Sequence, residues 1–145
     1  MEAKLESDQS VLKVMDGDVL LAIVVRGDYN NPGRAFFTPN EFPFQLGMHI
    51  RGPEDYIPPH AHNPFEELKM LPVQEFFLML EGKIEVGLYN EQTRRHHMRL
   101  VLGPGDMLVL NCPHDVKFLE QSKFIELKQG PYRGKDAEKK FFQPK

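Results

Sequence analysis

Residues 73–89 read VQEFFLMLEGKIEVGLY, and this stretch decides the fold class. Two runs rich in apolar and β-branched residues meet at Glu81-Gly82, a pair compatible with a tight turn in which glycine takes a positive φ. The pattern predicts a β-hairpin from Val73 to Tyr89. Alternation along its first run puts Phe77 and Met79 on the same face as Glu75.

The rest of the chain is divided into short strand-like runs by 12 prolines and 11 glycines, which leave little room for a long helix. Residues 63–70 alone could form a helical turn. We therefore expect an all-β fold with few or no helices, arranged as a sandwich or small barrel. The further strands are expected at residues 19–25, 44–51, 98–102, 107–110, 114–119 and 123–128.

Length and charge limit the function classes. A chain of 145 residues and 16.8 kDa is expected to form a single domain over residues 1–145. With 41% hydrophobic residues, the composition is globular and excludes wholesale disorder. Eighteen Lys and Arg against 21 Asp and Glu give a net charge of −3, without the basic excess on which nucleic-acid binding relies. We expect no nucleic-acid partner.

Cysteine content and hydropathy bear on localisation. Cys112 is the single cysteine, so no intramolecular disulfide can form, and the first ten residues, MEAKLESDQS, do not resemble a secretory signal. The longest apolar run, residues 19–25, has only the length of a strand. These features predict a cytoplasmic protein with no membrane partner.

Six histidines are many for so short a chain, and two of them form the sequence His60-Ala61-His62 after Pro58-Pro59. On a strand, side chains at i and i+2 point to the same side, about 7 Å apart. This spacing suits a pair of metal ligands. The same pattern is also expected of two polar residues on a solvated strand face that binds no metal. Adding Glu75 and His114 gives three imidazoles and one carboxylate, a set suited to a divalent transition metal.

The order and spacing of these residues resemble the cupin superfamily. His60, His62, Glu75 and Gly82 match its first motif, with the expected six residues between Glu75 and Gly82, and Gly105 and His114 match its second. The resemblance covers residues 44–132 and implies a double-stranded β-helix, the jelly-roll barrel, flanked by polar N- and C-terminal extensions. It implies one divalent ion per subunit (Fe, Mn, Ni, Zn or Cu) inside the barrel, held by His60, His62, Glu75 and His114.

The sequence departs from the motifs in two places. Twelve residues separate His62 from Glu75 where the family has three or four, so residues 63–74 are expected to form an inserted loop at the barrel mouth. Glu66, three residues beyond His62, is the alternative carboxylate ligand. Glu75 is preferred because its spacing to Gly82 matches the family motif. In the second motif, Pro113 and Phe118 replace the family's glycine and asparagine.

Several further residues could line a substrate pocket. His49 and Arg51 share a face of their strand, and Arg51 could hold a carboxylate or phosphate by paired hydrogen bonds. Together with them we expect Phe77, Met79 and Phe118 at the pocket. The opposite face of the first hairpin strand is also apolar and needs a cover, for which we expect an N-terminal strand or the second subunit of a homodimer.

Segments 102–106 and 125–132 resemble small bacterial cupins of unassigned activity that tend to occur beside surface-polysaccharide and nucleotide-sugar genes. The resemblance implies a small polar ligand, related to a sugar or a carboxylate. The leading hypothesis is a metal-dependent oxidoreductase or isomerase in which Glu75 also transfers a proton. Two alternatives stay open: a non-enzymatic binding or sensor protein, and a metal-free nucleotide-sugar epimerase or isomerase with His60 or His62 as base.

Overall fold

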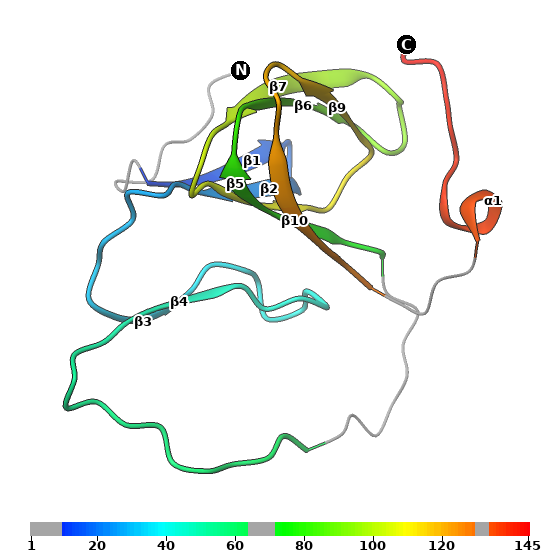
Figure 1. Ribbon diagram of the computed structural model, residues 1–145. Helices are drawn as coiled ribbons and strands as arrows, with labels where there is room; N and C mark the ends of the chain where they lie inside the picture. Colours follow the sequence, from blue (N-terminus) through cyan, green and yellow to red (C-terminus); the bar gives the residue numbers. More distant parts are fainter. Residues whose placement is uncertain (1–9, 64–71, 130–133) are drawn as a thin grey trace. The chain divides into compact units, whose positions relative to one another are not determined.

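The computed structural model describes residues 10–63, 72–129 and 134–145 (Figure 1). The chain divides into two compact units, a larger one of residues 1–29 and 73–145 and a smaller one of residues 30–72. Ten strands and a single helical turn, α1 (Lys135–Glu138), make up the regular structure of the described residues. The prediction of an all-β chain with few or no helices is confirmed. The helical turn expected at residues 63–70 lies almost entirely outside the described residues.

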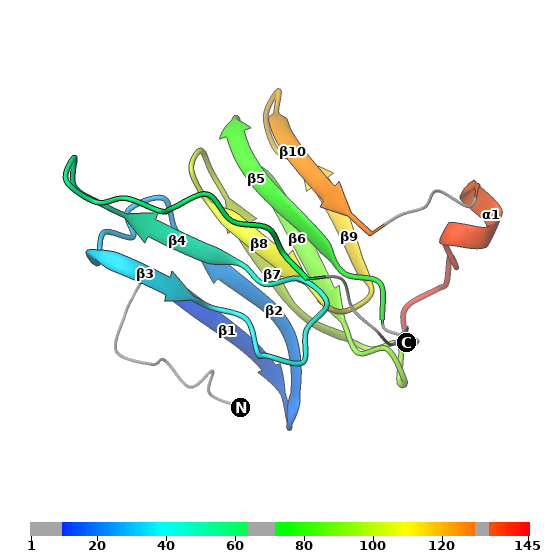
Figure 2. The ribbon, with the colours of Figure 1, turned by 90° about the horizontal axis from the view of Figure 1, so that it is seen from below.

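A five-stranded antiparallel sheet forms one layer of the larger unit. Its order is β1 (Val11–Asp16), β2 (Val19–Val25), β8 (Met107–Leu110), β5 (Glu75–Glu81) and β10 (Lys123–Lys128). Figure 2 shows β10 beside β5 at one edge and β1 at the other. The continuous apolar sequence of β2 matches its burial, because side chains on both faces of the strand are buried from Leu21 to Val25.

A three-stranded sheet forms the second layer, in the order β7 (His96–Leu102), β6 (Ile84–Tyr89) and β9 (His114–Phe118). Apolar side chains from both sheets meet in one core. Its buried members are Val14, Ala22, Val24, Phe77, Met79, Ile84, Val86, Leu88, Leu100, Leu102, Leu108 and Leu110. The larger unit is therefore two sheets held together by the hydrophobic effect.

Residues 73–89 do not form the predicted hairpin. β5 pairs with β8 and β10, whereas β6 pairs with β7 and β9, so the chain passes from one sheet to the other at Glu81-Gly82. The positive φ expected at Gly82 is present, at 83°. The hairpin prediction is wrong because the inner-face residues of both strands, such as Met79 and Ile84, are buried in the same core, which requires the strands to lie in opposite layers.

A second corner packs against this one. The chain crosses from β9 to β10 at residues 119–122, and the Leu119 amide donates to the Lys83 carbonyl over 3.0 Å. A Cβ added at Gly82 would lie 2.3 Å from the Gln121 carbonyl oxygen. Because β5 pairs with β10 and β6 pairs with β9, the two crossings form a single antiparallel ribbon bent from one sheet into the other.

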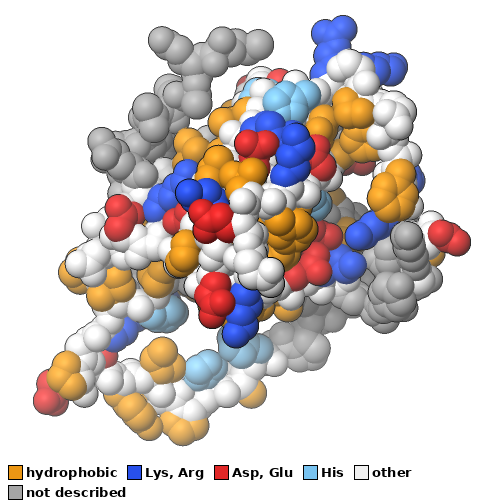
Figure 3. Space-filling view, turned by 45° about the horizontal axis from the view of Figure 1, so that its top comes forward, with side chains coloured by type: hydrophobic (Ala, Val, Ile, Leu, Met, Phe, Trp, Pro, Cys, Tyr) orange, Lys and Arg blue, Asp and Glu red, His pale blue; other side chains and the backbone are white. Residues whose placement is uncertain are grey.

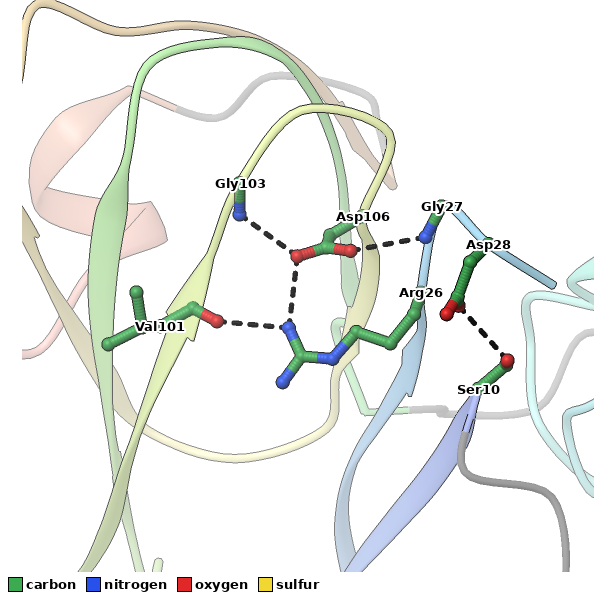
Figure 4. A network of polar contacts seen from close by, with 7 residues as sticks. All are labelled: Ser10, Arg26, Gly27, Asp28, Val101, Gly103 and Asp106. Carbon is green, nitrogen blue, oxygen red and sulfur yellow. Dashed lines mark hydrogen bonds and ion pairs between the residues drawn. The ribbon is translucent and has the colours of Figure 1, made fainter.

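Asp106 ties three parts of the larger unit together (Figure 4). Its carboxylate accepts hydrogen bonds from the Gly27 and Gly103 amides, over 3.1 and 2.9 Å, and pairs with Arg26 over 2.9 Å. Arg26 also donates to the Val101 carbonyl on β7. These contacts fix the crossing from β7 to β8 against the end of β2.

The smaller unit contains one antiparallel strand pair, β3 (Gly33–Phe36) with β4 (Gly47–Ile50). The Leu46 amide donates to the Thr38 hydroxyl over 3.0 Å and closes the connection between the strands. Residues 51–63 carry no regular secondary structure. β4 is shorter than the predicted strand at 44–51, and β3 lies where no strand was predicted.

Most of the other predicted strands are confirmed within one or two residues at each end, with β1 an additional strand. Leu12 and Val14 alternate there with Lys13 and Met15, a pattern that could have identified β1 before the Asp16-Gly17 turn. Its partner along the whole length is β2. The chain from Val11 on therefore belongs to the five-stranded sheet.

Charged side chains of both signs are interspersed on the face that Figure 3 shows. In the described part of the chain, no helix has the length and hydropathy needed to cross a bilayer.

Candidate functional site

Glu75 and His114 meet between the two sheets. Glu75 is the first residue of β5 and His114 the first of β9, and His114 Nε2 lies 3.0 Å from Glu75 Oε2. Their side chains are 15% and 23% exposed, so the pair is largely shielded from water while remaining accessible. The structure thus brings together two of the four predicted metal ligands, which lie 39 residues apart in the sequence.

The ring of His114 is oriented from its other nitrogen. Nδ1 lies 2.9 Å from the Cys112 carbonyl oxygen, which can only accept a hydrogen bond. Nδ1 therefore carries a proton, and Nε2 is the nitrogen presented to Glu75. Because both ring nitrogens face acceptors, the ring in this arrangement is an imidazolium. A backbone carbonyl that fixes the ring in this way is the usual support of a metal-binding histidine.

The two groups stabilise each other's charge. Burial disfavours the ionised form of Glu75, but the hydrogen bond from His114 and the positive charges of His114, Lys128 and Lys139 outweigh it and hold the pKa of Glu75 below its ordinary 4.5. Burial likewise disfavours the imidazolium, but the hydrogen bonds to Glu75 and the Cys112 carbonyl raise the pKa of His114 above 6.5.

Three residues of β10 lie on the same inner face of the five-stranded sheet as Glu75, and no sequence motif identifies them. In the ladder with β5, Phe124 lies opposite Met79, Glu126 opposite Phe77 and Lys128 opposite Glu75. Alternation along residues 123–128 already places Phe124, Glu126 and Lys128 on one face. Only the register with β5 identifies that face as the inner one.

The predicted pocket residues of the larger unit differ in burial. Met79 is fully buried in the core, and Phe77, 3% exposed, contacts His114 with ring centroids 6.3 Å apart. Phe118, opposite Ile84 in the ladder, also points to the inner face but is 63% exposed. Phe124 connects the two phenylalanines, with its ring centroid 4.9 Å from Phe77 and 6.3 Å from Phe118.

His60 and His62 belong to the smaller unit and lie outside any strand, contrary to the expected strand geometry. Pro58 and Pro59 precede them and have no amide hydrogen for a sheet ladder. The two rings are nevertheless neighbours, with centroids 5.2 Å apart. His60 Nδ1 lies 2.8 Å from the Pro58 carbonyl oxygen, which leaves His60 Nε2 to face a ligand.

His49 and Arg51 are exposed residues of the smaller unit. His49 lies on β4 opposite Arg34 of β3, and Arg51 follows the end of that strand. The Arg34 guanidinium stacks over Phe36, 5.7 Å from the ring centroid. Arg34, His49 and Arg51 are all exposed on this strand pair and its end, and their place in a substrate pocket stays a prediction.

The donor chemistry fits a divalent transition metal in the larger and the smaller unit alike. Each unit contributes a pair, Glu75 with His114 and His60 with His62, and the hydrogen bond at Nδ1 makes Nε2 the ligand atom of His60. His114 Nε2 is hydrogen-bonded to Glu75 and would have to lose its proton to bind a metal. Among the described residues, no cluster of three or more His, Cys, Asp or Glu side chains suited to a metal ion is present. The rival carboxylate Glu66 lies outside the described residues.

Two other polar groups of the larger unit are structural. On the outer face of the three-stranded sheet, Arg99 pairs with Glu85 and Asp115, and the Tyr89 hydroxyl donates to Asp115. A Cβ at Gly87 would meet the Arg99 guanidinium at 2.6 Å, so glycine leaves room for this network.

Burial raises the pKa of the Cys112 thiol to about 12, which makes it a poor nucleophile at neutral pH.

Comparisons with known proteins do not assign the chain to a family. The chain matches no family model, and searches of curated proteins and of solved structures gave no match. The residues and their geometry therefore carry the functional argument.

Proposed function

We propose that the chain is a metal-binding protein of cupin type, in which His60, His62, Glu75 and His114 hold one divalent transition metal. The observation that carries this proposal is the meeting of Glu75 and His114 on the inner face of the sheets, with His114 fixed by the Cys112 carbonyl. The adjacent rings of His60 and His62, with His60 fixed by the Pro58 carbonyl, support it from the smaller unit.

The jelly-roll barrel is part of the same proposal. The ribbon of β5 and β10 bends into β6 and β9, and the chain crosses again from β7 to β8. Repeated crossing between two facing sheets is the hallmark of a jelly roll.

The proposed substrate is a small polar molecule related to a sugar or a carboxylate, bound at the inner surface beside Glu75. A bound metal would supply Lewis-acid catalysis or, if it is iron, activation of dioxygen. Glu75 would hold or accept a proton at Oε2, and His114 would orient that oxygen. Phe77 and Phe124 would keep water away from the pair.

Equilibrium dialysis against Mn²⁺, Fe²⁺, Ni²⁺, Zn²⁺ or Cu²⁺ tests the metal proposal. We expect one ion per chain, with binding weakened roughly a hundredfold or more by His114→Ala or by His60→Ala with His62→Ala. The matched control is His96→Ala, which removes a histidine of β7 that is not among the proposed ligands. This variant should retain the metal. Folded protein that binds none of these ions would overturn the proposal.

A metal-free reaction is the second candidate, favoured by the direct contact of Glu75 with His114. A carboxylate and an imidazolium 3.0 Å apart can pass a proton to and from a substrate without a metal. Turnover of a nucleotide-sugar or a small keto acid that persists in excess chelator, and is lost in Glu75→Gln, would support this candidate against the metal-dependent one.

We also propose a homodimer. Leu80, Ile125 and Leu127 lie on the outer face of the five-stranded sheet and are 41%, 49% and 55% exposed. Such a row of apolar side chains is a feature of protein–protein contact surfaces.

A further inference from the structure

The inner surface next to the Glu75–His114 pair ends in an exposed aromatic side chain. Phe118 stacks on Phe124 with an angle of 28° between the rings and is still 63% exposed. In contrast, the core side chains that β9 faces, Ile84, Val86 and Leu88, are completely buried. An exposed ring on an otherwise core-facing side of a strand offers a flat apolar surface on which another ring can stack.

A cation lies farther along the same inner surface. Lys128 is half-buried and lies opposite Glu75 in the β5–β10 ladder. Glu75 is hydrogen-bonded to His114, and within the described part of the chain Lys128 makes no direct hydrogen bond or ion pair, although its charge acts on Glu75. A half-buried ammonium whose N–H donors make no direct hydrogen bond favours an anion from outside the chain.

The distance between these two features sets the length of the ligand. Phe124, which carries the stack with Phe118, lies four residues before Lys128 on β10, about 13 Å at 3.3 Å per residue. The side chain of lysine covers part of this distance. A ring stacked on Phe118 therefore needs a short chain of two or three atoms to bring an anionic group to Lys128.

We propose that the site takes a small ring-bearing anion, with its ring stacked on Phe118 and its carboxylate or phosphate held by Lys128. The proposal rests on the proposed function for the location of the site and names the class of substrate. It places the anionic end of the ligand between Lys128 and the Glu75–His114 pair, and the linking atoms beside Phe77 and Glu126.

Calorimetric titration of the full, chelator-treated chain with a series of simple probes tests the ligand. We expect 4-phenylbutyrate and 3-phenylpropionate to bind, and benzoate, which is too short to reach both groups, to bind roughly tenfold more weakly. The neutral amide of 4-phenylbutyrate and the ringless hexanoate should also lose about tenfold. A phosphate ester, 2-phenylethyl phosphate, shows which of the two anionic groups is preferred.

Variants then assign the binding to residues. Lys128→Met and Phe118→Leu should each weaken 4-phenylbutyrate binding roughly tenfold, while Phe118→Tyr keeps the stack and the affinity. Lys117→Met is the matched control, because Lys117 neighbours Phe118 but lies opposite Glu85, on the outer face. If Lys128→Met does not fold, the comparison of the anion with its amide still tests the charge requirement in the unaltered chain.

Equal binding of 4-phenylbutyrate and its amide would overturn the proposal, as would equal losses in Lys128→Met and Lys117→Met or no binding at millimolar concentration. Failure of this proposal differs from failure of the proposed function, because the titration is done without metal. A chain that binds one metal but no ring-bearing anion contradicts this proposal alone. A chain that binds the anion but no metal contradicts only the metal site.

Discussion

Glu75 and His114 each carry a charge that the other stabilises, and their opposite pKa shifts define a pH window. The lowered pKa of Glu75 adds stability above pH 4.5 that is lost as pH falls through the shifted value. The raised pKa of His114 adds stability below pH 6.5 that is lost as pH rises through the shifted value. The contribution of the pair is therefore complete between pH 4.5 and 6.5.

Glu75→Gln should consequently destabilise the metal-free chain most within that window. We expect a loss of about 1.5–3 kcal/mol near pH 5.5, since a charged hydrogen bond is removed and His114 stays largely shielded. The loss should shrink as pH rises through the raised pKa of His114, because above it the ring is neutral in the unaltered chain too. Urea unfolding over a series of pH values from 5.5 upward measures this, and a loss that does not change with pH would contradict the ion pair.

Sequence alone selected Glu75 and His114 because their spacing matched a motif, but it could not select Lys128, Glu126 or Phe124. Their importance depends on the register between β5 and β10, which is set by contacts between residues more than 40 positions apart. The rings of His60 and His62 are neighbours as expected, although the two residues lie outside any strand and strand alternation does not bring them together.

At the scale of elements, the crossings between the sheets determine where the site residues lie. The Glu81-Gly82 turn was recognisable from the sequence, but a tight hairpin and a crossing require the same positive-φ glycine. What distinguishes them is the partner of each strand, and β10 and β9 are far away in the sequence. Local patterns therefore predicted most strands and could not predict their pairing.

Gly82→Ala should destabilise the corner by about 2–4 kcal/mol. The added Cβ would meet the Gln121 carbonyl at 2.3 Å in addition to the strain of a φ of +83°. Gly17→Ala is the matched control, because Gly17 has a φ of +58° with nothing within 4 Å of the added Cβ. Thermal or urea unfolding should show a loss of only about 1 kcal/mol for the control. Equal losses would mean that the two corners do not pack as described.

Asp106→Ala should cost about 2–3 kcal/mol, because the Gly27 and Gly103 amides and Arg26 lose their common acceptor. Lys83→Met removes the exposed ion pair with Glu120 and should cost less than about 1 kcal/mol. Denaturant unfolding of both variants gives the comparison. If Asp106→Ala is as mild as Lys83→Met, then Asp106 does not hold the β7–β8 crossing.

At the scale of the whole molecule, the apolar row of Leu80, Ile125 and Leu127 leads to a prediction about association. Light scattering at micromolar concentration should give twice the chain mass of 16.8 kDa. Ile125→Lys with Leu127→Lys should give the monomer mass, because charges would replace the apolar contact. Lys123→Ala, on the same strand, should leave the mass unchanged. A monomeric unaltered chain would remove the homodimer proposal.

We propose that His60, His62, Glu75 and His114 hold a single metal ion. X-ray absorption at the edge of a bound transition metal counts imidazole ligands directly. We expect three imidazoles and at least one oxygen donor in the unaltered chain, and two imidazoles after His114→Ala. A first coordination shell of oxygen alone, or one that does not change in His114→Ala, would contradict it.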